Sequence, residues 1–207
     1  MLKICIIQND RLVLRRIRIC MARCKAYNEE DVIEKATELF WRKGYEATSM
    51  RELEEVMGIN KFSIYSSFGS KQGVFLECIR YYKRKIQPLV DKLKASNKGV
   101  EAIKEFFYDF LVFSKAESIW KGCLLTSTAT ELGADGEEII MAEIYSFSKM
   151  LKSIFADKLR ADGSTDEELI ARQANFLLVA KQGLSNAEKV FDHQVLVDFI
   201  ETTFEIV

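Results

Sequence analysis

The chain has very few of the residues that interrupt helices. Its 207 residues include a single proline and ten glycines. The remainder is rich in leucine, isoleucine, alanine, glutamate and lysine, a composition that favours helices. Hydrophobic residues make up 48% of the chain, which suffices for a real core and excludes a disordered protein. The composition therefore predicts an all-α protein of one domain or two small ones.

Histidine is almost absent, because His193 is the only one in the sequence. A nucleophile–histidine–acid set is then hard to assemble. Cys20 and Cys24 lie four residues apart, but no second pair accompanies them to complete a zinc site. No glycine-rich phosphate loop is present. We therefore expect no enzyme, no metal site and no cofactor.

Long apolar runs are also missing. Nothing approaches the roughly 20 apolar residues of a membrane span. Arginines near the N-terminus fall where a signal peptide needs its apolar segment. The five cysteines are widely spread and odd in number, which favours reduced thiols. These features predict a cytoplasmic protein with no membrane partner.

The formal net charge is −1, but its distribution is uneven. Residues 1–27 contain seven basic residues and one acidic residue, a net charge of +6 that leaves −7 for the rest. One interpretation is a basic arm that adds contacts to nucleic-acid phosphates. The other is a mis-assigned start, with translation beginning at Met21. We favour the second, because the motif described below needs nothing before about residue 25.

Three helices are predicted in the first third of the chain. Asn28 followed by acidic residues is typical of a helix N-terminus, and Gly44 is suited to end that helix. Thr48 can cap a second helix, which Gly58 ends. A short third helix is expected over about 61–67.

A long fourth helix is predicted over 71–95, and Pro88 lies inside it. A proline in this position either breaks the helix or bends it, here where an N-terminal head would meet the rest of the molecule. Residues 96–99 are the expected boundary. An aromatic-rich helix follows, and the spacing of apolar residues predicts further helices over 123–132, 137–160, 166–190 and 193–207. The total is about nine to ten helices.

Two short helices joined by a glycine turn, with a helix on either side, are typical of a helix-turn-helix domain. The small polar side chains of the third helix would let it enter a major groove. The stretch from Ala36 to Phe75 contains A-T-E-L-F, then G-Y-E-A-T-S, then Y-S-S-F-G-S-K-Q-G-V-F. In these residues and their spacing it resembles the TetR family of repressors.

The resemblance implies roles for particular residues. Tyr65 and Lys71 would contact phosphates, whereas Thr48 and Arg51 would touch backbone or bases. Phe62 would either meet a thymine methyl group or pack within the protein. The residues expected to bind DNA are Thr48, Arg51, Lys61, Phe62, Ser63, Tyr65, Ser66, Ser67 and Lys71.

The segment Gly122-Cys123-Leu124-Leu125, followed by Glu131-Leu132, resembles one branch of the family in which it lies in the ligand-binding body. Apolar walls with a few polar groups are typical of small-molecule sites. The expected effector pocket comprises Phe106, Phe110, Phe113, Trp120, Cys123, Ser127, Tyr145 and Phe176, although ordinary core packing also explains the aromatic residues. A redox role for Cys123 is disfavoured, because nothing near it in the sequence lowers the pKa of its thiol.

In TetR-like proteins two late helices meet their symmetry mates in a four-helix bundle, and the helices over 137–160 and 166–190 fit that role. The expected interface comprises Ile144, Phe147, Leu151, Phe155, Leu177 and Leu184. The domains would be a basic extension over 1–24, a helix-turn-helix domain over 25–72 and an effector-binding and dimerisation domain over 73–207.

These features together predict a homodimeric, ligand-responsive repressor. Its partners would be a palindromic double-stranded DNA operator and a small apolar or amphipathic effector. The alternative is a helical adaptor whose head does not bind specific DNA.

Overall fold

The computed structural model describes residues 27–116, 122–133 and 136–207. Within these ranges the chain forms nine α-helices and no strand, which confirms the all-α prediction. The helices are α1 (Glu29–Lys43), α2 (Met50–Met57), α3 (Lys61–Phe68), α4 (Lys71–Ala95), α5 (Val100–Ala116), α6 (Leu124–Leu132), α7 (Glu138–Ala161), α8 (Glu167–Ala187) and α9 (His193–Glu205).

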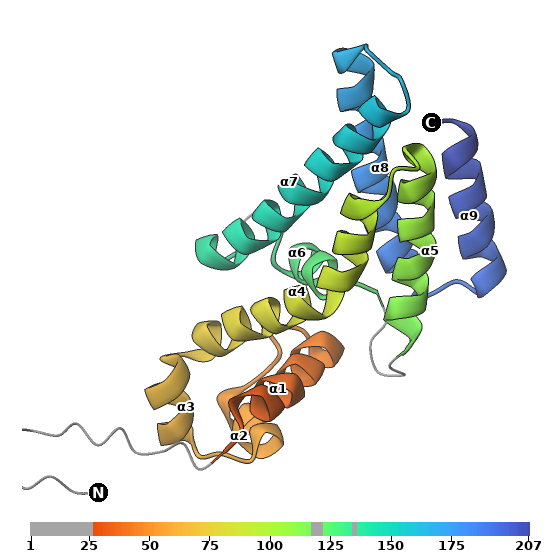
Figure 1. Ribbon diagram of the computed structural model, residues 1–207. Coiled ribbons are helices and arrows are strands. Elements are labelled where there is room, and N and C mark those ends of the chain that lie inside the picture. The colour runs from red at the N-terminus through yellow and green to blue at the C-terminus, as the bar shows by residue number, and fades with distance from the viewer. Residues whose placement is uncertain (1–26, 117–121, 134–135) are drawn as a thin grey trace, which may run out of the picture.

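Helices α1 to α3 form a small head beneath the other helices (Figure 1). The side chain of an N-cap residue starts each head helix: Asn28 accepts from the Glu30 N–H, and Asn60 accepts from the Ser63 N–H. The expected cap of α2 is wrong by one residue, because Ser49 and not Thr48 caps that helix. Ser49 and Glu52 form a capping box, in which each side chain bonds to the backbone of the other residue.

Helix α4 joins the head to the body. It packs on α1 and α3 in the head and on α5, α6 and α7 in the body. It runs without interruption through Pro88, so the proline does not break the helix. Figure 1 shows its first part lying along the head and its later part turning upward into the body. A helix that belongs to both parts can carry a movement from one to the other.

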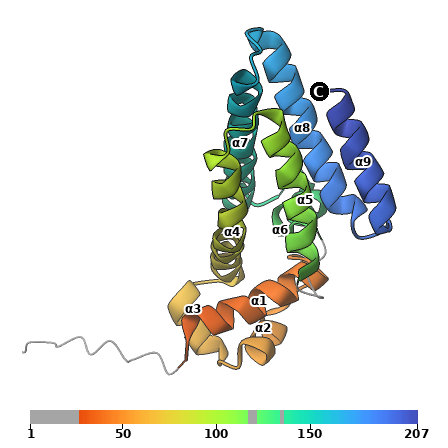
Figure 2. The ribbon, with the colours of Figure 1, turned by 45° about the vertical axis from the view of Figure 1, so that its right-hand side comes forward.

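Helices α5 to α9, together with the end of α4, form the body (Figure 2). Its core is aromatic: Phe106 and Phe107 are buried and lie edge-on or tilted against Phe155, with ring centroids 6.1 and 6.3 Å apart. Such ring pairs add specific contacts to the burial of apolar area. No helix among the described residues is long and apolar enough to cross a membrane.

Candidate DNA-binding surface and effector site

Helix α3 has one side buried in the head and an unusual opposite side. Ile64 is fully buried, whereas 79% of Phe62 and 44% of Tyr65 are exposed. The Lys61 ammonium group lies 5.8 Å from the centre of the Tyr65 ring. An exposed face with a large apolar ring, a phenol and a cation is suited to contact base edges and phosphates together.

The other expected DNA-binding residues of α2 and α3 lie at different depths. Arg51 and Ser66 are exposed, while Ser63 and Ser67 are half-buried. Ser67 forms a 2.6 Å hydrogen bond with the hydroxyl of Tyr27. This bond ties the end of α3 to the start of the described chain and leaves Arg51 and Ser66 as the more accessible groups.

Thr48 and Lys71 are engaged within the protein. Thr48 is 1% exposed, and its hydroxyl donates a 2.6 Å hydrogen bond to the Gly44 carbonyl. The Lys71 ammonium group donates to the carbonyls of Tyr45 and Thr48 at 2.9 and 3.1 Å, and it lies 4.4 Å from the centre of the Tyr45 ring. Their first role is thus to shape the turn between α1 and α2, and a phosphate would share Lys71 with those carbonyls.

Two glutamates from the body hold the same turn, and the sequence patterns did not reveal them. The Glu131 carboxylate, at the end of α6, accepts hydrogen bonds from the N–H groups of Tyr45 and Glu46, each at 2.9 Å. Glu137 accepts a 2.5 Å hydrogen bond from the Tyr45 hydroxyl. Gly44 fits here because its φ is +93° and an added Cβ would lie 2.6 Å from Glu131. We call these contacts the head–body latch.

Most of the residues expected in an effector pocket do not line one. Phe106 and Phe110 are buried in the core, and Phe113 packs against Tyr82 with ring centroids 6.2 Å apart. Tyr145 and Phe176 point outward, with 61% and 42% exposure. None of these five aromatic residues lines the cavity between α6, α7 and α8, because helical spacing gives a buried face without giving a cavity.

Two further expected pocket residues are Ser127 and Trp120. Ser127 accepts a 2.7 Å hydrogen bond from the exposed ammonium group of Lys189. Trp120 lies outside the described residues. Cys123 is thus the expected residue that the structure places at a cavity.

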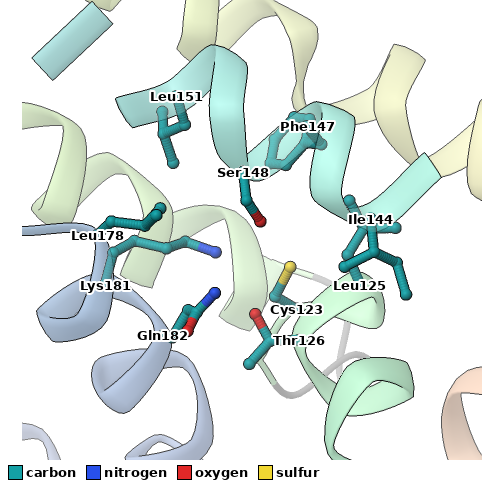
Figure 3. A pocket seen from close by; sticks show the side chains of 10 residues that line it. All are labelled: Cys123, Leu125, Thr126, Ile144, Phe147, Ser148, Leu151, Leu178, Lys181 and Gln182. Atoms are coloured by element: carbon teal, nitrogen blue, oxygen red, sulfur yellow. The ribbon is translucent and has the colours of Figure 1, made fainter. Parts of the chain in front are cut away.

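That cavity lies between α6, α7 and α8 and has a volume of about 20 Å³. Figure 3 shows the Cys123 sulfur and the Lys181 amine pointing toward the same space. Both polar and apolar side chains line the cavity. The lining comprises Cys123, Leu125, Thr126, Ile144, Phe147, Ser148, Leu151, Leu178, Lys181 and Gln182.

The electrostatic setting of Cys123 differs from that of the other buried cysteine, Cys78. Burial alone would raise the pKa of the Cys123 thiol, but the Lys181 charge and hydrogen bonds from Tyr82 and Thr126 bring it below its ordinary value. Burial raises the pKa of Cys78 to about 12. Lys181 comes from a helix far along the chain, so the sequence around Cys123 gave no sign of it.

The six residues expected at a dimer interface lie in the core of their own chain. Leu151, Phe155, Leu177 and Leu184 are at most 1% exposed, and the other two, Ile144 and Phe147, are at most 8% exposed. Their apolar stripe is real, but the chain's own helices cover it. The single chain therefore does not leave these six residues free on its surface.

Helices α8 and α9 instead carry large apolar side chains on their outer faces. Val179 is 66% exposed and Ile206 67% exposed. The residues recur at helical spacing along α8, along α9 and at the residue that follows α9, and we call them the apolar stripe: Leu169, Phe176, Val179, Val195, Phe199 and Ile206. A stripe of this kind marks an interaction surface more often than isolated apolar residues do.

The family model of the bacterial regulatory proteins, TetR family, matches residues 32–78, which span α1 to the first turns of α4. The HTH-type transcriptional repressor ComR of Escherichia coli is 30% identical over 119 residues, covering 56% of this chain and 57% of ComR. The uncharacterised HTH-type regulator YxaF of Bacillus subtilis is 28% identical over 144 residues, covering 68% of this chain and 74% of YxaF. The chain spans 57–58% of the length of the first curated relatives it matches.

Solved structures show the same fold. The TetR family regulator CifR, as a cysteine mutant bound to a 26-base-pair operator, superposes with a TM-score of 0.79 at 23% identity, covering 88% of this chain and 98% of CifR. The reduced form of NemR from E. coli has a TM-score of 0.71 at 18% identity, covering 86% and 96%. At these sequence identities, both similarities show a shared arrangement of helices.

Proposed function

We propose that this chain is a homodimeric repressor of the TetR family, which binds a palindromic DNA operator and releases it in response to a small effector. The match of residues 32–78 to that family's model and the similarity to ComR support this proposal. We assign residues 25–72 to a helix-turn-helix head and residues 73–207 to a helical body for effector binding and dimerisation. We assign the whole chain a regulatory role and not a catalytic one.

The outward face of α3 carries this proposal. A ring as large as Phe62 is normally buried, and leaving it 79% exposed beside Lys61 and Tyr65 is unfavourable unless a partner covers it. A major groove offers thymine methyl groups to the ring and phosphates to the phenol and ammonium groups. Repressor-named relatives such as ComR, and CifR with its operator, support the same reading.

The dimer is supported by the apolar stripe on α8 and α9. In an isologous contact the same surface of two copies meets around a two-fold axis. The stripe belongs to the last two helices of the chain, whereas α3 belongs to the head. Pairing through the stripe would therefore leave α3 exposed in both copies. Two such heads would read two half-sites of a palindrome.

Release requires that the effector bind one arrangement of the dimer better than the other. Helices α4 and α6 are suited to transmit the difference, because each contacts both the cavity region and the head. A shift in either helix would change the separation of the two recognition helices and so weaken the simultaneous binding of both half-sites.

The test is an anisotropy titration of the purified protein against labelled DNA from upstream of its own gene, at two salt concentrations. We expect tight binding to one palindromic segment that weakens with salt, because phosphate contacts release counterions. Tyr65→Ala should weaken binding to every sequence alike, and Tyr145→Ala, at an exposed tyrosine of α7, should not. Salt-independent or absent binding, also in a selection from random sequences, would favour the adaptor alternative.

A further inference from the structure

Lys181 is an anomaly in the body. It is 2% exposed, and no described residue forms a hydrogen bond or salt bridge with its ammonium group. That group lies 4.1 Å from the centre of the Phe110 ring, a favourable contact for a cation but an incomplete replacement for water. A buried charge without a counter-ion is so costly that one is expected nearby.

The Cys123 sulfur can serve as the counter-ion of Lys181. Its thiol shares the small cavity with Lys181 (Figure 3). The charge of Lys181 opposes the effect of burial and holds the pKa of Cys123 below its ordinary value. The other acid near Lys181 is Glu188, the residue that follows the last turn of α8. Burial raises the pKa of its carboxyl despite the nearby charge of Lys181, which favours its neutral form. The thiolate of Cys123 is thus the natural counter-ion.

Tyr82 and Thr126 complete the setting. The Tyr82 hydroxyl is fully buried, and its hydrogen bond to the sulfur helps to lower the pKa of Cys123. Burial, with Cys123 next, raises the pKa of this phenol well above its ordinary value, so it stays protonated beside the sulfur. Thr126 adds its backbone N–H and its side chain. Reactive thiolates are found in settings of this kind, with a cation and hydrogen-bond donors around the sulfur.

The size of the cavity limits what can reach the sulfur. A volume of about 20 Å³ holds about one water molecule, whereas pockets for reversible ligands measure about 300–1,000 Å³. A molecule bound only by non-covalent contacts would therefore gain little binding free energy in this cavity. A small molecule that forms a covalent bond needs no such volume in the closed state.

We propose that Cys123, paired with Lys181 at the cavity between α6, α7 and α8, is a sensor site that is alkylated by small α,β-unsaturated carbonyl compounds. The thiolate attacks the β-carbon and forms a carbon–sulfur bond. The electrons of the double bond pass to the carbonyl oxygen, and the resulting enolate takes a proton from the Lys181 ammonium group. The ion pair becomes a neutral thioether and a neutral amine, so no oxidant or reductant is needed.

The adduct can reach the head through α6, a part of the proposal that rests on the proposed repressor function. Cys123 is the N-cap residue of α6, and Glu131 near the end of the same helix binds the N–H groups of Tyr45 and Glu46. An adduct larger than the cavity must displace α6 from α7 and α8. The displacement would pull on the head–body latch and disfavour the DNA-bound arrangement.

The chemistry can be tested without DNA. The full-length protein is treated with acrolein, and the adduct on each cysteine peptide is followed by mass spectrometry between pH 5 and 10. Cys78 is the internal control, since it is as buried as Cys123 but lacks a neighbouring cation. We expect Cys123 to react about 100-fold faster than Cys78 at pH 7, with a rate that rises around a midpoint lower than that of an ordinary thiol. Equal rates would overturn the proposal.

Variants of Lys181 test whether the reactivity of Cys123 depends on the neighbouring positive charge or only on access of the reagent to the sulfur. Lys181→Met should slow alkylation of Cys123 by about tenfold or more at pH 7 and move the midpoint upward, whereas Lys181→Arg should keep both near the wild-type values. Circular dichroism confirms that each variant is folded. An unchanged rate and midpoint in Lys181→Met would overturn the pairing. If Lys181→Met does not fold, the pH midpoint of the wild-type protein decides the question.

The regulatory consequence has its own measurement. Acrolein should release the wild-type protein from its operator and leave Cys123→Ser bound. If Cys123 is alkylated while the operator remains bound, the sensing step is wrong although the repressor function stands. If the untreated protein binds no DNA, the proposed repressor function is wrong. The rates of alkylation then still test whether Cys123 is a reactive thiol.

Discussion

At the scale of single residues, Ser49 and Glu52 close the start of α2 by reciprocal hydrogen bonds. The Ser49 N–H donates to the Glu52 carboxylate at 3.0 Å, and the Glu52 N–H donates to the Ser49 hydroxyl at 3.3 Å. Replacing a serine cap by alanine typically costs about 1 kcal/mol. We expect Ser49→Ala to lower the free energy of unfolding by that order at pH 7 in denaturant titrations, and Ser66→Ala, at an exposed serine of α3, to change it little.

The same contact gives a pH dependence. Hydrogen bonds from Lys43, then from Ser49, lower the pKa of Glu52 from its ordinary value of 4.5 to about 2. Because the pKa is lower in the folded state, the ionised carboxylate stabilises the fold above pH 4.5, and this contribution is lost as the pH falls toward 2. The difference between wild type and Ser49→Ala should therefore shrink between pH 5 and pH 2.5. A difference that is constant or grows on acidification would contradict the capping box.

Individual residues also show which features of the DNA-binding surface could be predicted from the sequence. The outward position of Phe62 on α3 follows from local spacing, because two residues place it about 200° around the helix from the buried Ile64. The engagement of Thr48 by Gly44, and of Lys71 by the turn carbonyls, does not follow from spacing. Those contacts depend on the backbone conformation of the turn between α1 and α2, which the sequence pattern does not predict.

At the scale of elements, α6 is the short rod between the cavity and the head. Its last turn carries Glu131, whose carboxylate protects the N–H groups of Tyr45 and Glu46. We expect Glu131→Ala to speed hydrogen exchange at these two amides by about tenfold or more, since amides that lose a hydrogen-bond acceptor become open to water. Mass spectrometry of the peptide over 44–48 measures the effect.

The control for this experiment is Glu205→Ala, which removes an exposed glutamate at the end of α9. It should leave exchange in the peptide over 44–48 unchanged. Slow exchange at Tyr45 and Glu46 in Glu131→Ala would mean that the turn is held by Lys71 and Glu137 alone. Helix α6 would then lose its assigned role in transmitting a change from Cys123 to the head.

Element ends were predictable where local chemistry marks them. The fourth helix occupies 71–95 as expected, because Ser70 caps its start and the chain leaves the helix at Ser96. Contacts between distant elements were not predictable. The pairing of Cys123 in α6 with Lys181 in α8 arises only when three helices pack together, and no local pattern records it.

At the scale of the whole molecule, the remaining question is which face meets a second copy. The stripe of Ile144, Phe147, Leu151 and Phe155 has the spacing of an interface, yet it packs inside its own chain. Spacing identifies an apolar face, but only the complete fold shows whether the same chain already covers it. Among the described residues, α8 and α9 carry the largest group of exposed apolar side chains.

We expect Val179→Asp to convert the dimer into a monomer. Val179 is 66% exposed in the single chain, so the substitution leaves the core intact, but at the proposed interface it would bury an unpaired carboxylate next to its symmetry mate. Sedimentation velocity measures the oligomeric state. The matched control is Val112→Asp on α5, where the valine is 69% exposed and the dimer should persist.

The monomer should also lose operator affinity, although its recognition helix is unchanged. Two linked heads bind a palindrome about 100-fold or more tighter than one head does, so Val179→Asp should weaken operator binding by at least that order. Binding to a single half-site should be equal in the two variants. A Val179→Asp protein that stays dimeric, or a Val112→Asp protein that dissociates, would place the interface on another face and with it change the distance between the two copies of α3.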